Sequence, residues 1–182
     1  AISQDGRFLA MGEYTPGGLS IVDSTTLKVV KRHSGAYEHE GETYVSRVTG
    51  VVDAPGNRFV CALMEGNEVW IVDASKPDFP IEHRIATPKA QPYDAMITPD
   101  GRHYLVAHLG TSNVSVIDLL HPDRGAKVIS LRDPNKEYDR NAPVKLPHMA
   151  AWAVAGQRVF VPLVGEDRLA VLDRQTWTFV TS

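Results

Sequence analysis

A repeat of glycine and aspartate runs through the whole sequence and restricts its fold more than any other feature. Four glycines each stand 17 residues before an aspartate, and a short β-prone run precedes every aspartate. The glycines are Gly6, Gly56, Gly101 and Gly156, and the aspartates are Asp23, Asp73, Asp118 and Asp173. Repeats of this length are typical of solenoids and propellers.

Each repeat contains short runs of β-branched and aromatic residues separated by turn residues. In the second repeat these runs are 58–63, 68–72 and 81–85, and a shorter run at 51–52 comes before them. Glycine, proline, asparagine and aspartate gather between the runs, as expected for β-hairpins. No segment shows sustained helical periodicity. Four strands in each repeat predict an all-β fold made of four-stranded β-propeller blades.

The repeat boundaries predict about four blades in one partial propeller domain over residues 1–182. The blades are expected at about 1–33, 45–86, 92–131 and 147–182. The first repeat has almost no room for an innermost strand, since only five residues precede Gly6. Propeller rings have roughly four to eight blades. We therefore expect the chain to be about half of a larger ring, with its start cut.

Composition narrows the class of protein further. The 182 residues are 43% hydrophobic, which is typical of a globular protein, and a net charge of −3 gives no sign of nucleic-acid binding. No stretch approaches the roughly 18 apolar residues that a membrane helix needs. Cys61 is the single cysteine, so an internal disulfide is excluded and either the cytoplasm or the periplasm is compatible.

Propeller topology predicts which loops share a face. The long connections between blades and the loops between the second and third strands lie on one face, here called the loop face. The short glycine turns lie on the opposite face, here called the turn face. Functional residues usually lie on loops that a rigid scaffold holds, so we expect the site on the loop face. Its candidates, near the starts of innermost strands, are Arg47, Tyr93, Asp94 and His148.

These four side chains could form one site. Tyr93 and His148 stand eight residues before a repeat glycine, and Arg47 stands nine before its own. An arginine can bind anions, histidine and aspartate can transfer protons, and a phenol can orient a ligand. Structural roles remain open: Tyr93 is better explained as structural, Asp94 can bond a turn, and Arg47 can pair with Glu42 or Asp94. A polar ring around a propeller channel often holds only water, which leaves both interpretations of His148 open.

Three further loop-face residues are candidate ligand contacts. They are Tyr14, Glu65 and His108. The sequence contains no nucleophile elbow, phosphate loop or dinucleotide fingerprint. Its histidines and carboxylates do not follow metal-ligand spacing, so no metal site is predicted.

Five stretches of the sequence resemble one protein family. They are 1–7, 14–18, 46–56, 91–95 and 147–152. They are similar to the NirF family of haem d1 biosynthesis proteins, relatives of the d1-haem domain of cytochrome cd1 nitrite reductase and of NirN. The resemblance implies an eight-bladed propeller that holds a d1-type tetrapyrrole, haem d1 or its precursor dihydro-haem d1. It also implies a late step of haem d1 biosynthesis in the periplasm of denitrifying bacteria, with dehydrogenation as one form of that step.

The resemblance also suggests residue roles. His148 is similar to an active-site histidine of the nitrite reductase, and Tyr93-Asp94 occupies the place of its second active-site histidine and a following aspartate. This implies that His148 and Asp94 are the catalytic candidates, as proton-handling groups. Arg47 would face a carboxylate of the macrocycle, because guanidinium pairs well with carboxylate. The remaining expected cofactor contacts are Tyr93, Tyr14, Glu65 and His108. The sequence departs from the family where Ala150-Ala151 replace an expected Glu-Gly pair.

The expected partners follow from the same resemblance. They are the tetrapyrrole itself, other haem d1 biosynthesis proteins or nitrite reductase, and a second copy of the chain in a homodimer. Nucleic acid is not expected. The alternative function is a non-catalytic periplasmic β-propeller that binds a ligand or a protein. A sugar-lactone hydrolase is a weaker possibility, because the sequence shows no matching set of acids and metal ligands.

Overall fold

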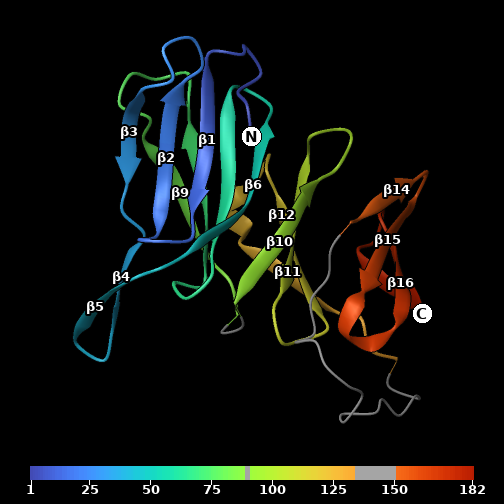
Figure 1. The fold of residues 1–182 in the computed structure, drawn as a ribbon. Helices are drawn as coiled ribbons and strands as arrows, with labels where there is room; N and C mark the ends of the chain where they lie inside the picture. Colours follow the sequence, from blue (N-terminus) through green and yellow to red (C-terminus); the bar gives the residue numbers. More distant parts are fainter. Residues whose placement is uncertain (89–90, 134–150) are drawn as a thin grey trace.

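Four antiparallel sheets follow one another along the part of the chain that the computed structural model describes, residues 1–88, 91–133 and 151–182 (Figure 1). The first sheet has the order β1 (Phe8–Glu13), β2 (Gly18–Asp23), β3 (Val29–His33). The second has β6 (Val48–Ala54), β7 (Arg58–Leu63), β8 (Glu68–Asp73), β9 (Ile81–Ala86). The third has β10 (Pro92–Ile97), β11 (His103–His108), β12 (Asn113–Asp118), β13 (Ala126–Ser130). The fourth has β14 (Ala153–Ala155), β15 (Arg158–Leu163), β16 (Arg168–Asp173), β17 (Thr178–Thr181).

Every sheet is an antiparallel meander in sequence order, which is the topology of a propeller blade. The all-β prediction of propeller blades is therefore confirmed. The first sheet has three strands, and in place of an innermost strand it has a single bridge between Ile2 and Leu9. The first and last sheets lie at opposite ends of the arrangement, and no strand pairing joins them among the described residues (Figure 1).

The repeated glycines and aspartates form the turns on the turn face. All four glycines have a positive φ, between 55° and 83°, which side-chain-bearing residues rarely adopt. Each aspartate accepts backbone hydrogen bonds from the turn that follows it. Asp173 Oδ1, for example, accepts from the amides of Gln175 and Thr176, both at 2.9 Å. The positive φ explains why the repeat keeps a glycine, and the local hydrogen bonds explain why it keeps an aspartate.

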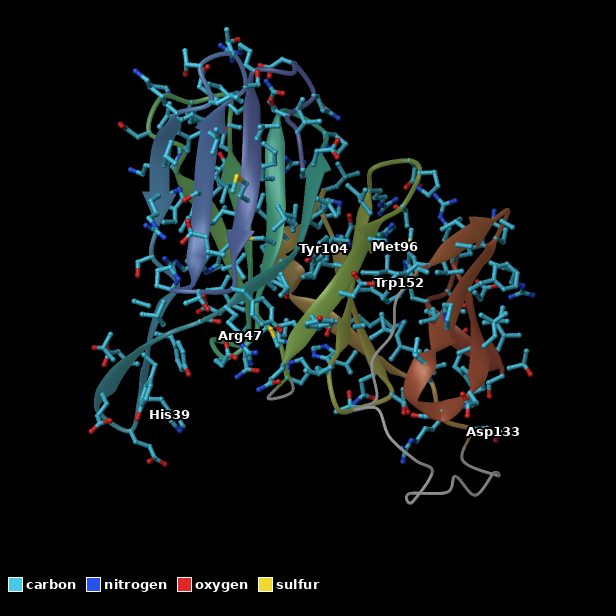
Figure 2. All side chains as sticks on the ribbon, viewed as in Figure 1. His39, Arg47, Met96, Tyr104, Asp133 and Trp152 are labelled. Carbon is cyan, nitrogen blue, oxygen red and sulfur yellow. The ribbon has the colours of Figure 1, made fainter. Side chains whose placement is uncertain are left out.

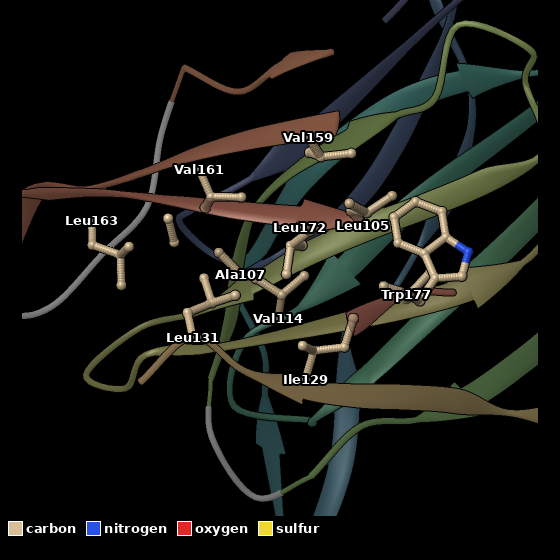
Figure 3. Packing of buried hydrophobic residues seen from close by; sticks show 12 residues of the cluster. Leu105, Ala107, Val114, Ile129, Leu131, Val159, Val161, Leu163, Leu172 and Trp177 are labelled. Carbon is tan, nitrogen blue, oxygen red and sulfur yellow. The ribbon is translucent and has the colours of Figure 1, made fainter. Parts of the chain in front are cut away.

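Three hydrophobic clusters fill the boundaries between neighbouring sheets. The cluster between the third and fourth sheets includes Leu105, Val116 and Ile129 on one side and Val159, Leu172 and Trp177 on the other (Figure 3). Similar clusters join the first sheet to the second and the second to the third. Alternation along each strand produces this arrangement, because successive side chains point to opposite faces. In β7, Phe59 and Cys61 therefore face the first sheet while Val60 faces the third.

A two-stranded hairpin projects from the loop face between the first and second sheets (Figure 1). It consists of β4 (Ala36–His39) and β5 (Glu42–Val45), where the sequence predicted only a long loop over 33–47. Glu40 and Gly41 both have positive φ, 52° and 84°, as a two-residue type I′ turn requires. The signal was weak because asparagine or aspartate, not glutamate, usually precedes glycine in such a turn.

The only helices among the described residues are two short 3-10 turns. They are η1 (Pro122–Arg124) and η2 (Val164–Glu166). Within the described ranges, no helix is both long and apolar enough to cross a membrane. The absence of sustained helical periodicity in the sequence agrees with this result.

Candidate functional site

An ion pair between Arg47 and Glu65 lies at the centre of the loop-face site. Arg47, between β5 and β6, donates from Nε to Glu65 Oε1 at 2.6 Å, and its Nη2 also contacts that oxygen. The backbone amide of Arg47 donates to Glu65 Oε2 at 2.9 Å. The bonds to Glu65 raise the pKa of Arg47. Burial raises the pKa of Glu65, but the bonds from Arg47 lower it more, so it lies below its usual value.

Ser46 holds the Arg47–Glu65 pair in place through hydrogen bonds to the loop that carries Glu65. Its side chain is fully buried, and its Oγ accepts hydrogen bonds from the amides of Glu65 and Gly66 at 3.1 and 3.2 Å. The hydroxyl also lies 3.3 Å from Glu65 Oε2. The loop that carries Glu65 is therefore bonded both to Ser46 and to the next residue, Arg47. Sequence reasoning did not single out Ser46, since nothing in a lone serine indicates its burial.

Two tyrosines border the guanidinium of Arg47. The Arg47 Cζ atom lies 4.9 Å from the ring centre of Tyr14, in a cation–π arrangement. Tyr14 follows β1 and is 50% exposed, so its ring is available at the surface. Tyr93, in β10, is partly buried, and burial followed by its interactions with Tyr14 raises its pKa. Residues from three successive sheets thus meet, and Figure 2 marks the position of Arg47.

Asp94 lies next to Tyr93 but its side chain has a different partner. Its Oδ2 accepts a hydrogen bond of 3.1 Å from Nε1 of Trp152, which precedes β14. Tyr104 is labelled in Figure 2. Its hydroxyl donates to the carbonyl of Gly50 at 2.7 Å. Asp94 thus faces the boundary with the fourth sheet. Sequence reasoning did not predict the contact with Trp152, because it joins residues 58 positions apart.

The structure places His108 differently from the sequence prediction. It was expected in a loop, but it is the last residue of β11 and is fully buried. Its Nε2 lies 2.7 Å from the hydroxyl of Ser115 in the neighbouring strand. His108 is therefore part of the interior of the third sheet. Its proposed contact with a ligand stays a prediction.

His148, the principal catalytic candidate, lies outside the described residues. Its predicted approach to Arg47, Tyr93 and Asp94 therefore stays a prediction. The structure brings together Tyr14, Arg47, Glu65 and Tyr93. The described residues contain no group of three or more histidine, cysteine, aspartate or glutamate side chains that could hold a metal ion.

The blade topology and the loop-face cluster define this chain as part of a β-propeller with a polar surface site. The β-propeller domain of Cps50 (Swd1) from Myceliophteria thermophila has a TM-score of 0.71 and 18% identity, over 98% of this chain and 52% of that chain. At that identity the likeness shows the fold alone. Dihydro-heme d1 dehydrogenase NirN, solved in complex with DHE, has a TM-score of 0.72 and 26% identity, over 99% of this chain and 36% of that chain.

The family is shown by sequence. The model of the Cytochrome D1 heme domain family matches residues 1–182, so the chain belongs to that family. Protein NirF of Pseudomonas aeruginosa is 42% identical over 177 residues, which cover 97% of this chain and 45% of that protein. The chain therefore spans less than half the length of this relative. The likeness to NirF and NirN confirms the resemblance predicted from the sequence stretches.

Proposed function

We propose that the protein binds a d1-type tetrapyrrole, haem d1 or its dihydro precursor, on the loop face and acts in a late step of haem d1 formation. The family match and the likeness to NirF and NirN support this class of ligand. The observation that carries the proposal is the cluster of Tyr14, Arg47 and Tyr93. As part of the same proposal, the full ring has eight blades and works in the periplasm.

The chemistry of the cluster fits a planar macrocycle with carboxylate side chains. Arg47 keeps 36% of its side chain exposed despite its pairing with Glu65, so its guanidinium can still meet a carboxylate. The half-exposed ring of Tyr14 offers an aromatic face to a flat ligand. The raised pKa of Tyr93 keeps its phenol protonated near neutral pH, so it can donate a hydrogen bond. Glu65 keeps the guanidinium in place.

The proposed reaction is a dehydrogenation, with Asp94 and His148 as the proton-handling residues. The tetrapyrrole would be the substrate: one of its carbon–carbon single bonds would become double by loss of two protons and two electrons, and the electrons would pass to a separate redox partner. Trp152 bonds Oδ2 of Asp94, and no bond from the described residues reaches Oδ1. Asp94 can therefore accept a proton at Oδ1. Imidazole is suited to the second proton transfer, since it titrates near neutral pH.

Titration of the full-length protein with haem d1, followed by the change in the Soret band, tests the binding. Arg47→Ala is expected to weaken binding at least about tenfold, because a charge-assisted bond to a carboxylate is lost. Arg158→Ala is the matched control. It removes another arginine–carboxylate pair, with Asp173 at 2.9 Å, but on the turn face. Equal haem d1 binding by Arg47→Ala and Arg158→Ala would show that the loop face is not the haem site.

Conversion of dihydro-haem d1 to haem d1, with an electron acceptor supplied, tests the catalytic part. Asp94→Asn should keep binding, since its amide oxygen can still accept from Trp152, but lose most turnover. His148→Ala should lose turnover or change the haem spectrum. Wild-type turnover in both variants would leave haem binding intact and refute the proton-handling roles.

The alternative is a non-catalytic propeller that only binds its ligand or a partner. One observation favours it: both acidic side chains of the site are engaged, Glu65 with Arg47 and Asp94 with Trp152. Such pairing is what a rigid binding surface needs. Normal haem binding together with absent turnover in the wild-type protein, in the presence of several electron acceptors, would favour this alternative.

A further inference from the structure

A groove lies on the turn face where the third and fourth sheets meet, on the side of the fold away from the Arg47 cluster. Its volume is about 690 Å³. This lies within the usual range of small-molecule sites, on the order of 300–1,000 Å³. Its walls come from the glycine turns and aspartate turns of both sheets. Its charged and aromatic lining residues are Asp100, Arg102, His103, Asp118, Arg124, Lys127, Arg174 and Trp177.

The preceding sheet boundary is built from matching positions, but its turns are packed differently. There, a side chain added at Gly101 would overlap the ring of Pro55. At the groove, a Cβ on the matching Gly156 meets nothing within 4 Å. The residue after the repeat aspartate also differs. After Asp118 it is the buried Leu119, and after Asp173 it is Arg174. At the groove, a charged side chain therefore stands where the preceding boundary has a buried apolar one.

The charges of the groove do not cancel. Arg102 pairs with Asp118 at 2.9 Å, and Arg174 pairs with Asp100 across the boundary. These are the two carboxylates of the lining. No carboxylate of the described residues forms an ion pair with the two remaining cations, Arg124 and Lys127.

Lys127 also spans the groove. Its Nζ donates to the backbone carbonyl of Thr176, in the fourth sheet, at 2.9 Å. This bond holds the ammonium group at the groove instead of leaving it free in solvent. Lys127 and the exposed Arg124 therefore place two uncompensated positive charges at one opening.

An aromatic wall completes the groove. The rings of His103 and Trp177 lie 4.9 Å apart and tilted at 58°. His103 is flanked by the two ion pairs, Arg102–Asp118 and Arg174–Asp100, and burial lowers its pKa. The imidazole is therefore mostly neutral at pH 7 and presents a ring rather than a further charge. Its Nδ1 is buried without a hydrogen-bond partner.

We propose that this groove binds a small planar organic anion that carries two carboxylate groups. The ring of the ligand lies against His103 and Trp177, and its carboxylates meet Arg124 and Lys127. Guanidinium and ammonium groups give charge-assisted bonds to carboxylates, and aromatic rings contact each other with modest additional stabilisation. The site is independent of the haem proposal, because it shares no residue with the loop-face cluster.

Isothermal titration of the full-length protein tests the site with two probes of equal shape. Isophthalate has a planar ring and two carboxylates, and isophthalamide is its uncharged counterpart. Isophthalate should bind saturably, and isophthalamide should not bind measurably. The double variant Arg124→Gln/Lys127→Gln should weaken isophthalate binding at least about tenfold. Both side chains are exposed, so the fold should be unaffected.

Two further variants separate the groove from general surface charge. Lys28→Gln removes an exposed lysine of the first sheet and should leave isophthalate affinity unchanged. Arg174→Leu leaves the carboxylate of Asp100 without its ion-pair partner, and this uncompensated negative charge at the groove should weaken isophthalate binding. The proposal is overturned if the amide binds as well as the acid, or if the double variant matches Lys28→Gln. It is also overturned if inorganic phosphate binds as tightly as isophthalate, because the aromatic wall would then contribute nothing.

Discussion

Nε1 of Trp152 donates a hydrogen bond of 3.1 Å to Oδ2 of Asp94, and this bond connects the fourth sheet to β10 of the third. The contact gives the indole two roles. Its ring packs against the hydrophobic cluster of that boundary, while its N–H holds a carboxylate of the candidate site. The orientation of Asp94 therefore depends on the position of the fourth sheet, which carries Trp152.

A double-mutant cycle should measure this coupling. Trp152→Phe keeps much of the ring packing and removes the donor, and Asp94→Ala removes the acceptor. We expect a coupling free energy of about 1.5–3 kcal/mol in urea unfolding of the full-length protein, as for a hydrogen bond to a charged group. Purely additive effects of the two substitutions would show that the contact does not stabilise the fold.

Alanine at two matching glycines should have unequal effects. Gly156→Ala puts a side chain at φ 55° with open space around it, so it should cost about 1–2 kcal/mol of stability from backbone strain alone. Gly101→Ala adds an overlap with Pro55, which should cost about 1–3 kcal/mol more. Denaturant unfolding of the two variants checks this order. Equal losses would mean that the Pro55 contact relaxes freely.

Asp118 should make stability depend on pH in the acid range. The bond from Arg102 is the main cause that lowers the pKa of Asp118, from 3.8 to about 2. A carboxyl group with a lowered folded pKa stabilises the fold above its unfolded pKa, and this contribution is lost as pH falls from 3.8 towards 2. The free energy of unfolding of Asp118→Asn should therefore fall less steeply over that range than that of the wild type. Parallel profiles would contradict this assignment.

Cys61 should be unreactive until the boundary between the first and second sheets opens. The thiol is fully buried, and burial raises its pKa to about 12, so the reactive thiolate is scarce at pH 8. We expect no labelling of the folded protein by a thiol reagent over minutes, and complete labelling in guanidinium chloride. Fast labelling without denaturant would show that this cluster opens readily.

The strands and turns could be predicted because both depend on local pattern. Runs such as 58–63 and 103–107 are short, mostly apolar and bounded by turn residues, which is the pattern of a strand buried on both faces, and both strands are buried almost throughout. The repeat glycines mark the turns, since their positive φ is a backbone requirement that the sequence shows directly. Strand limits are set less locally: the β-prone run of the sequence begins at Leu27, but β3 begins at Val29.

The side-chain partners of the site depend on tertiary packing, and the sequence does not record that. Register correctly placed Tyr93 and Asp94 at the start of an innermost strand. It could not show that Asp94 would accept a hydrogen bond from Trp152. It also could not show that Arg47 would pair with Glu65, since the sequence suggested Glu42 or Asp94 as its acidic partner. His108 was assigned to a loop because β11 extends one residue further than its apolar run suggests.

The three clusters between the sheets also bear on how such a chain can evolve. Each cluster is shared only by sheets that are neighbours in sequence, so a duplicated sheet carries both halves of a new boundary with it. A ring can then grow by gene duplication without redesign of the blades already present. After duplication each boundary can diverge separately, as the contrast between Pro55–Gly101 and the open space at Gly156 illustrates. Selection can therefore alter one boundary and leave the loop face unchanged.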